Sequence, residues 1–246
     1  MNKGRYIVSS NQRISSTGVW KMILHSAENC VFPELRPGQF VNIALKGHYL
    51  RRPISVCDWD SENRSITLVY KTVGAGTRDM STCLTGTELD LLAGLGNGFP
   101  IEGKRPLLVG GGVGMPPMLA LARAFLKSGI APVVVGGFAS AADVILEDDF
   151  SALGIEMLIA TMDGSRGVAG TVLEHVRKID ADCIYACGPK PMLKALSKLP
   201  QPAYLSVEER MGCGYGVCMG CNCPTVDGYK RVCKDGPVFR KEDLVW

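Results

Sequence analysis

Long apolar segments are absent from this sequence of 246 residues. No run reaches the roughly 18 consecutive apolar residues that a membrane-spanning helix needs. The N-terminal stretch, residues 1–16, is polar and lacks the apolar core of a secretory signal. We therefore expect a cytoplasmic protein without a membrane contact. Because thiols stay reduced in the cytoplasm, the ten cysteines do not indicate a disulfide framework.

A large excess of either charge is also lacking, since 27 basic and 24 acidic residues give a formal net charge of +3. This balance provides no large excess of positive charge to bind a nucleic acid, and we expect no such partner. The sequence holds only three histidines, His25, His48 and His175, and all lie outside the motifs described below. We expect structural or solvated roles for them. No acid–base pair for substrate chemistry is evident.

Residues 1–102 have the pattern of an all-β domain. Short runs rich in Val, Ile, Leu and aromatic residues occur at Val19–Leu24, Phe40–Ala44 and Ser65–Lys71, with turn signals between them. Their spacing predicts a small antiparallel β-barrel.

Residues 103–205 alternate between apolar strand-like runs and helical patterns, which predicts a central α/β nucleotide-binding domain with a parallel sheet. The expected strands are Pro106–Val109, Pro132–Val135, Met157–Ala160 and Cys183–Ala186. The expected helices are Met115–Ser128, Val168–Val176 and Pro191–Leu199.

Residues 206–246 are irregular, and they hold too few apolar side chains for a core of their own. A metal cluster is the obvious group to hold such a segment together. The fold class expected is thus an α+β multidomain chain: a barrel, an α/β domain and a small cysteine-rich module that holds a metal cluster.

Cys213, Cys218 and Cys221 give the spacing C-x4-C-x2-C, and further cysteines follow. This is the plant-type ferredoxin spacing for a [2Fe–2S] cluster. The glycines between the cysteines let the loop wrap closely and turn backbone N–H groups towards the sulfurs. A structural zinc site or unconnected buried cysteines are the alternatives, although zinc sites usually show two separated C-x2-C pairs.

The fourth ligand is chosen between Cys223 and Cys233. Side chains of Cys221 and Cys223 diverge on an extended loop, whereas Tyr229–Val232 has the pattern of a strand that returns towards the loop. We therefore expect Cys233 as the fourth ligand.

A glycine turn follows the first strand of the α/β region and precedes a helix. Free N–H groups at such a turn attract the pyrophosphate of a dinucleotide, but a glycine turn can also serve tight packing alone. The candidate residues are Gly110, Gly111, Gly112 and Gly114.

The strand Cys183–Ala186 ends in Cys187, Gly188 and Pro189. Ligands of open α/β sheets bind at the carboxyl ends of strands, which would put Cys187 and Gly188 near a nicotinamide ring. The alternative for Cys187 is a small buried hydrophobe. No basic side chain follows the second strand to bind a 2′-phosphate, so NAD is favoured over NADP.

Two short segments of the barrel could bind a second nucleotide. Arg52, Pro53, Ile54 and Ser55 follow a turn, and Gly76 and Thr77 open a short helix. An arginine beside such a helix start suits a pyrophosphate. A surface basic pair and an ordinary turn explain the same residues.

The order of these motifs resembles one family closely. It is the electron-transfer subunit family of bacterial NAD-linked dihydroorotate dehydrogenase, within the ferredoxin reductase superfamily, and the resemblance covers nearly the whole chain. It implies FAD held by the residues of the two barrel segments and by the strand residues Val69, Tyr70 and Lys71. It also implies cluster ligation by Cys213, Cys218, Cys221 and Cys233. Ile54 stands where the broader superfamily often has a tyrosine that stacks on the flavin.

The resemblance further implies a partner: a catalytic subunit that contains FMN and carries out the orotate chemistry, in a heterotetramer of two plus two subunits. Ser55 is the candidate hydrogen-bonding residue near flavin N5. A flavin is expected between NADH, which gives up a hydride, and a cluster, which accepts single electrons. The alternatives are a subunit of another flavoenzyme, such as an NADPH–ferredoxin oxidoreductase or a sulfide dehydrogenase, and a non-catalytic redox sensor or zinc-stabilised module.

Overall fold

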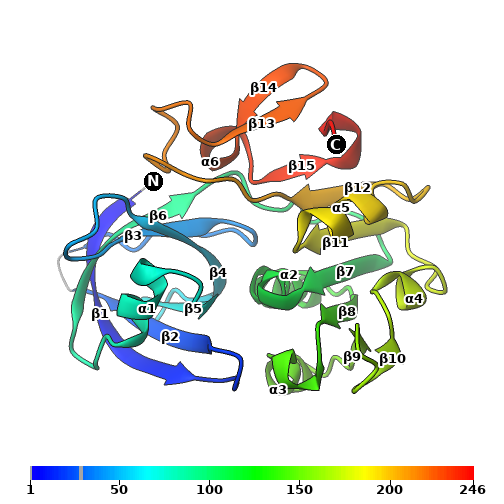
Figure 1. Cartoon of the computed structure of the whole chain (residues 1–246), viewed down its shortest axis with the longest axis horizontal. Helices are drawn as coiled ribbons and strands as arrows, with labels where there is room; N and C mark the ends of the chain where they lie inside the picture. The colour runs from blue at the N-terminus through cyan, green and yellow to red at the C-terminus, as the bar shows by residue number, and fades with distance from the viewer. Residues whose placement is uncertain (1, 28–29) are drawn as a thin grey trace.

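The computed structural model describes residues 2–27 and 30–246. A β-barrel and a layered α/β unit lie side by side, and the C-terminal segment crosses above both (Figure 1). The expected fold class is confirmed. Within the described part of the chain, no helix is long and apolar enough to cross a membrane.

The barrel is closed by six antiparallel strands in the order β1-β2-β5-β4-β3-β6. They are β1 (Asn2–Arg13), β2 (Val19–Ser26), β3 (Phe40–Ala44), β4 (Arg52–Asp60), β5 (Ser65–Lys71) and β6 (Glu88–Leu95). Helix α1 (Ala75–Ser81) lies between β5 and β6 in the chain. Strand β1 was not predicted from the sequence, because its exposed polar residues hide the alternation that buries Tyr6 and Val8.

The α/β unit contains one sheet of seven strands in the order β10-β9-β8-β7-β11-β12-β15. Its strands are β7 (Pro106–Gly111), β8 (Val133–Phe138), β9 (Met157–Thr161), β10 (Val168–Ala169), β11 (Cys183–Cys187), β12 (Ala203–Ser206) and β15 (Val238–Arg240). Its helices are α2 (Pro116–Lys127), α3 (Glu147–Ser151), α4 (Leu173–Val176) and α5 (Lys190–Leu196). Three short 3₁₀ helices, η1 (Gly112–Gly114), η2 (Ala141–Asp143) and η3 (Lys241–Asp243), complete the elements of this sheet and its connections.

The predicted helix over Val168–Val176 is wrong. The chain instead forms the short strand β10, and helix α4 starts only at Leu173. Gly167 and Gly170, with φ of +66° and +113°, flank β10 in a backbone region that interrupts a helix.

Helix α2 packs against β4 and thereby joins the α/β unit to the barrel. Arg123 of α2 and Asp58 of β4 form an ion pair at 2.8 Å. Cys57 and Val69 of the barrel lie in the same buried cluster as Met118 of α2. Apolar contact between the two units is therefore continuous.

The C-terminal segment has no separate core. It forms the hairpin β13 (Asn222–Thr225) and β14 (Gly228–Arg231), then α6 (Val232–Asp235). The strand expected over Tyr229–Val232 is therefore β14, shifted by one residue. Val232 and Cys233 pack with Phe40 and Leu95 of the barrel in one buried cluster, and β15 extends the α/β sheet next to β12.

Two asparagines of the barrel hold this segment. The buried Asn42 of β3 donates from Nδ2 to the Cys213 carbonyl oxygen over 3.1 Å. Asn97, which follows β6, donates from Nδ2 to the Val238 carbonyl oxygen over 2.7 Å and accepts from the Val238 N–H over 3.1 Å. The cysteine-rich segment is therefore bonded at two separate points to the neighbouring β3 and the residue just after β6.

We predict that Asn42→Asp destabilises this junction by about 2 kcal/mol, because a buried carboxylate cannot donate to the Cys213 carbonyl. Hydrogen exchange should become faster in residues 212–218 and stay unchanged in β1 and β2. Asn222→Ala, at an exposed position of β13, is the matched control. Unchanged exchange in the Asn42→Asp variant would show that this hydrogen bond does not hold the loop.

Candidate functional site

The four cysteines predicted as ligands lie in two pairs. The Cys218 sulfur accepts a hydrogen bond from the Cys213 backbone N–H over 3.3 Å, and the Cys213 sulfur accepts one from the Cys218 N–H over 3.4 Å. The sulfurs of Cys221 and Cys233 are 3.3 Å apart. All four are free thiols.

Backbone donors surround Cys213. Burial alone would raise the pKa of this thiol, but N–H groups of Tyr215, Cys218 and Val217 outweigh burial and lower the pKa to about 6. The Val217 N–H lies 3.3 Å from the Cys213 sulfur. Donors that stabilise a thiolate favour a metal ligand.

The loop can wrap in this way because glycines occupy its tightest positions. Gly214 and Gly216 have φ of +76° and +90°. A Cβ atom on Gly214 would lie 2.2 Å from Asn42 Nδ2, and one on Gly216 would lie 2.6 Å from the Lys234 side chain. Both residues are therefore needed for close approach as well as for conformation.

The arrangement of the four cysteines as two pairs matches a binuclear cluster, whose two irons each take two protein ligands.

Cys223 belongs to neither pair. It is buried in β13, its sulfur lies 3.8 Å from the Pro224 carbonyl oxygen, and burial followed by the charge of Glu209 raises its pKa. This environment supports the choice of Cys233 as the fourth ligand.

The glycine turn and the turn after β11 lie against each other. Gly110 and Cys187 are register partners on the parallel strands β7 and β11. A Cβ on Gly114 would lie 2.1 Å from the Cys187 carbonyl oxygen, and one on Gly111 would lie 2.7 Å from Pro189. Close packing, the alternative considered above, explains these two glycines and also Gly110, which abuts Met115.

Gly112 differs from its neighbours. It has φ of +52°, and a Cβ there would meet no atom within 4 Å. The open space over Gly112, at the carboxyl edge of the sheet, leaves its backbone accessible to a ligand.

The Cys187 thiol is uncharged. Burial raises its pKa to about 12, although a hydrogen bond with Ser206 acts in the opposite direction. At neutral pH Cys187 therefore presents a protonated, weakly polar surface at the end of β11.

Strand β4 changes its pairing partner at the predicted flavin residues. The first half of β4 pairs with β3, from Ile43↔Arg52 to Phe40↔Ser55. Its second half pairs with β5, starting at Val56↔Leu68. Beyond that point, β5 residues 69–71 remain paired with β2 but no longer with β4. The backbone edge of residues 69–71 that faces β4 is thus unpaired, and we call this break in the strand pairing, opposite residues 52–55, the slot.

Most side chains around this slot are buried or already bonded within the protein. Val69 and Tyr70 are buried, and the Tyr70 hydroxyl donates to Asn11 over 3.0 Å. Lys71 lies 3.5 Å from Asp143 of the α/β unit. Pro53, Ile54 and Ser55 are half-buried. The β5 residues can therefore offer a ligand mainly their backbone.

Arg52 lies at the end of the slot, across Gly76. A Cβ on Gly76 would be 2.0 Å from Arg52 Nε. Thr77 accepts the N–H of Val73 over 2.9 Å and donates to Gly74, so it shapes the loop before α1. The predicted pyrophosphate residues Arg52, Gly76 and Thr77 are brought together.

Arg166 was missed from the sequence, because a basic side chain was sought only after β8. Arg166 follows β9, and the sheet brings it to the loop after β8, where its Nη2 lies 2.5 Å from Glu147 Oε2. The sheet thus places a basic side chain, ion-paired with a carboxylate, where the sequence analysis had expected none.

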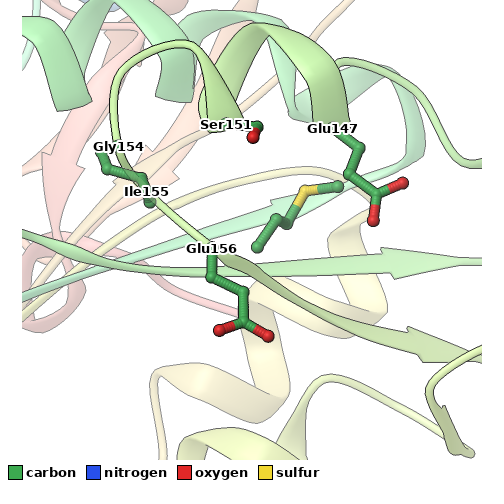
Figure 2. A pocket seen from close by; sticks show the side chains of 6 residues that line it. Glu147, Ser151, Gly154, Ile155 and Glu156 are labelled. Atoms are coloured by element: carbon green, nitrogen blue, oxygen red, sulfur yellow. The ribbon is translucent and has the colours of Figure 1, made fainter.

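Two hollows lie away from the site residues predicted from the sequence. One of about 300 Å³ is formed by the α3–β9 connection, where Figure 2 shows Glu147 and Ser151 on α3 and Glu156 on the connection that follows. The other, of about 320 Å³, lies between Lys21 of the barrel and the α3 region. None of the predicted site residues lines either hollow.

Comparison with known proteins agrees with this geometry. The family model described as the iron–sulfur cluster binding domain of dihydroorotate dehydrogenase B matches residues 208–245. A solved structure of an NADH-dependent reduced ferredoxin-NADP oxidoreductase, studied for flavin-based electron bifurcation, has a TM-score of 0.88 and 31% identity, covering 98% of this chain and 90% of that one. Phthalate dioxygenase reductase shares the fold, with a TM-score of 0.69 and 17% identity over 90% of this chain and 86% of its own.

The electron transfer subunit of dihydroorotate dehydrogenase B (NAD(+)) from Bacillus caldolyticus is 43% identical over 251 residues, with 96% of each chain covered. Identity at this level over nearly the full length places this chain in the family of the electron transfer subunits of NAD-linked dihydroorotate dehydrogenase B.

Proposed function

We propose that this chain is the electron-transfer subunit of an NAD-linked dihydroorotate dehydrogenase, and that it holds FAD, a [2Fe–2S] cluster and NAD. One observation carries the proposal: Asn42 pairs with Pro53 at the slot and also donates to the Cys213 carbonyl. Strand β3 therefore contacts predicted flavin residues and a predicted cluster residue through the same asparagine. When bound, FAD supplies the exchange between the hydride of NADH and single electrons.

For FAD, we propose that Arg52 and the backbone at Gly76 bind the pyrophosphate. Residues 53–55 and 69–71 would line the two sides of the ring system, with Ser55 as the hydrogen-bonding side chain near N5. The unpaired edge of β5 supports this assignment, because buried backbone groups require partners.

For NAD, we propose the carboxyl edge of β7 and β11. The open Gly112 would meet the pyrophosphate, while Cys187, Gly188 and Pro189 would form a wall beside the nicotinamide. Gly110, Gly111 and Gly114 would act by letting the two turns pack closely.

For the cluster, we propose Cys213 with Cys218 and Cys221 with Cys233. Their loop carries the exposed side chains of Tyr215, Val217 and Met219, which are 44%, 74% and 55% exposed. Apolar exposure around a redox centre marks a partner surface. We therefore propose that the FMN-containing catalytic subunit docks on this loop, in a cytoplasmic heterotetramer of two plus two subunits. The domain bounds 1–102, 103–205 and 206–246 remain a prediction.

A combined assay tests this function. The purified chain should show flavin and [2Fe–2S] absorption. Together with its FMN-containing partner it should reduce NAD with dihydroorotate as the electron donor. A colourless chain would contradict the proposed cofactors. A coloured chain whose complex lacks dihydroorotate-dependent NAD reduction would contradict the proposed reaction.

A second candidate function rests on the match to the ferredoxin-NADP oxidoreductase structure, which covers 98% of this chain. In that case the complex would exchange electrons between NAD(P)H and ferredoxin and would not use dihydroorotate. The same preparation, assayed with reduced ferredoxin in place of dihydroorotate, distinguishes the two.

We predict that Cys218→Ser prevents cluster assembly and abolishes reduction of the partner, because it removes a thiolate ligand. NADH oxidation with an artificial acceptor should partly survive through FAD. Iron and acid-labile sulfide per chain are the measurements. Cys223→Ser is the matched control and should keep a full cluster. The ligand set is wrong if the two variants behave alike.

We also predict slow alkylation of Cys187. With a pKa of about 12, its reactive thiolate is scarce at pH 8, so iodoacetamide should label it about three orders of magnitude more slowly than free cysteine. The rate should rise steeply between pH 8 and 10. Peptide-resolved mass spectrometry follows this residue among the ten cysteines. Labelling at the rate of the free amino acid would argue for an ionised, nucleophilic Cys187.

A further inference from the structure

Of the structural or solvated roles expected for the histidines, the bonding of His48 fits a structural one. It lies in the turn between β3 and β4, and only 15% of its side chain is exposed. Both ring nitrogens have close partners. Nδ1 is 2.8 Å from Arg52 Nη2, and Nε2 is 2.6 Å from Asp79 Oδ2.

The chemistry of the partners assigns the tautomer. A guanidinium only donates, so His48 Nδ1 must accept from Arg52. Nε2 then carries the proton and donates to the Asp79 carboxylate, which only accepts. Arg52 therefore donates a hydrogen bond to His48, and His48 donates one to Asp79 of α1.

These two hydrogen bonds hold the Arg52 side chain in one position. Arginine loses considerable rotamer freedom when it is ordered. Here Nη1 donates to the Leu50 carbonyl and Nη2 to His48, and the guanidinium lies across Gly76. The remaining N–H donors of Arg52 are left for a ligand.

We propose that His48, oriented by Asp79, is a positioning residue for FAD: it holds the Arg52 guanidinium ready for the cofactor pyrophosphate. This inference rests on the proposed FAD site at Arg52. Preorganisation of this kind improves affinity because the arginine is already ordered before the cofactor binds.

The test measures FAD release from the full chain carrying its cluster, followed by the rise of flavin fluorescence after dilution. His48→Ala should accelerate release roughly 10-fold to 100-fold, as expected for a lost hydrogen bond to a charged group. His48→Asn should restore most of the affinity, because its carbonyl oxygen can accept from Arg52 near the position of Nδ1. Asp79→Ala should have a smaller effect in the same direction.

His25→Ala is the matched control. His25 lies on β2, is hydrogen-bonded to the Asn63 carbonyl oxygen over 3.2 Å, and should release FAD at the parental rate when replaced. The KM for NADH should be unchanged in the His48 variants, since their effect is on the flavin site.

Arg52→Ala separates the inference from the function on which it rests. If Arg52→Ala releases FAD at the parental rate, the proposed FAD site is wrong. If Arg52→Ala accelerates release and His48→Ala does not, the site stands and the positioning role is overturned. A lower thermal unfolding midpoint of His48→Ala with an unchanged release rate also overturns it, since His48 would then only stabilise the turn.

Discussion

The attachment of the cysteine-rich segment to the barrel is the contact on which the other parts of this structure depend. That segment has no core of its own, so it is held by the neighbouring surfaces. Phe40 and Leu95 lie in the same buried cluster as Val232 and Cys233, and Asn42 donates to the carbonyl of Cys213. Because Asn42 also pairs with Pro53, one strand fixes both the slot and the cluster loop. The proposed redox groups are therefore placed by β3 and do not rely on a flexible linker.

Local sequence patterns predicted a good part of this architecture. The change from strand-like runs to alternating strands and helices identified the barrel and the α/β unit, because side-chain periodicity follows secondary structure. The C-x4-C-x2-C spacing selected three cysteines, and the strand expected over Tyr229–Val232 selected Cys233. The fold brings these four cysteines together as two pairs. Such spacing is informative because one short loop must supply several ligands. The flavin residues were identified only by resemblance to a family, because Arg52 and Gly76 are distant in sequence and ordinary by themselves.

Features that depend on strand pairing or on contacts between distant residues could not be predicted from the sequence. The slot exists because β4 changes partner between Ser55 and Val56, and no local pattern encodes that change. His48 looked isolated in the sequence, and only the fold places it between Arg52 and Asp79. Gly110, Gly111 and Gly114 serve packing, against Met115, Pro189 and Cys187 respectively, and a single motif could not separate this role from phosphate binding.

Strand β15 follows the last proposed cluster ligand and covers the edge of β12 in the α/β sheet. An uncovered edge strand offers free backbone groups to other chains and promotes aggregation. Helix α6 carries Cys233 and leads directly into β15. The segment proposed to hold the cluster therefore also shields the edge of the α/β sheet.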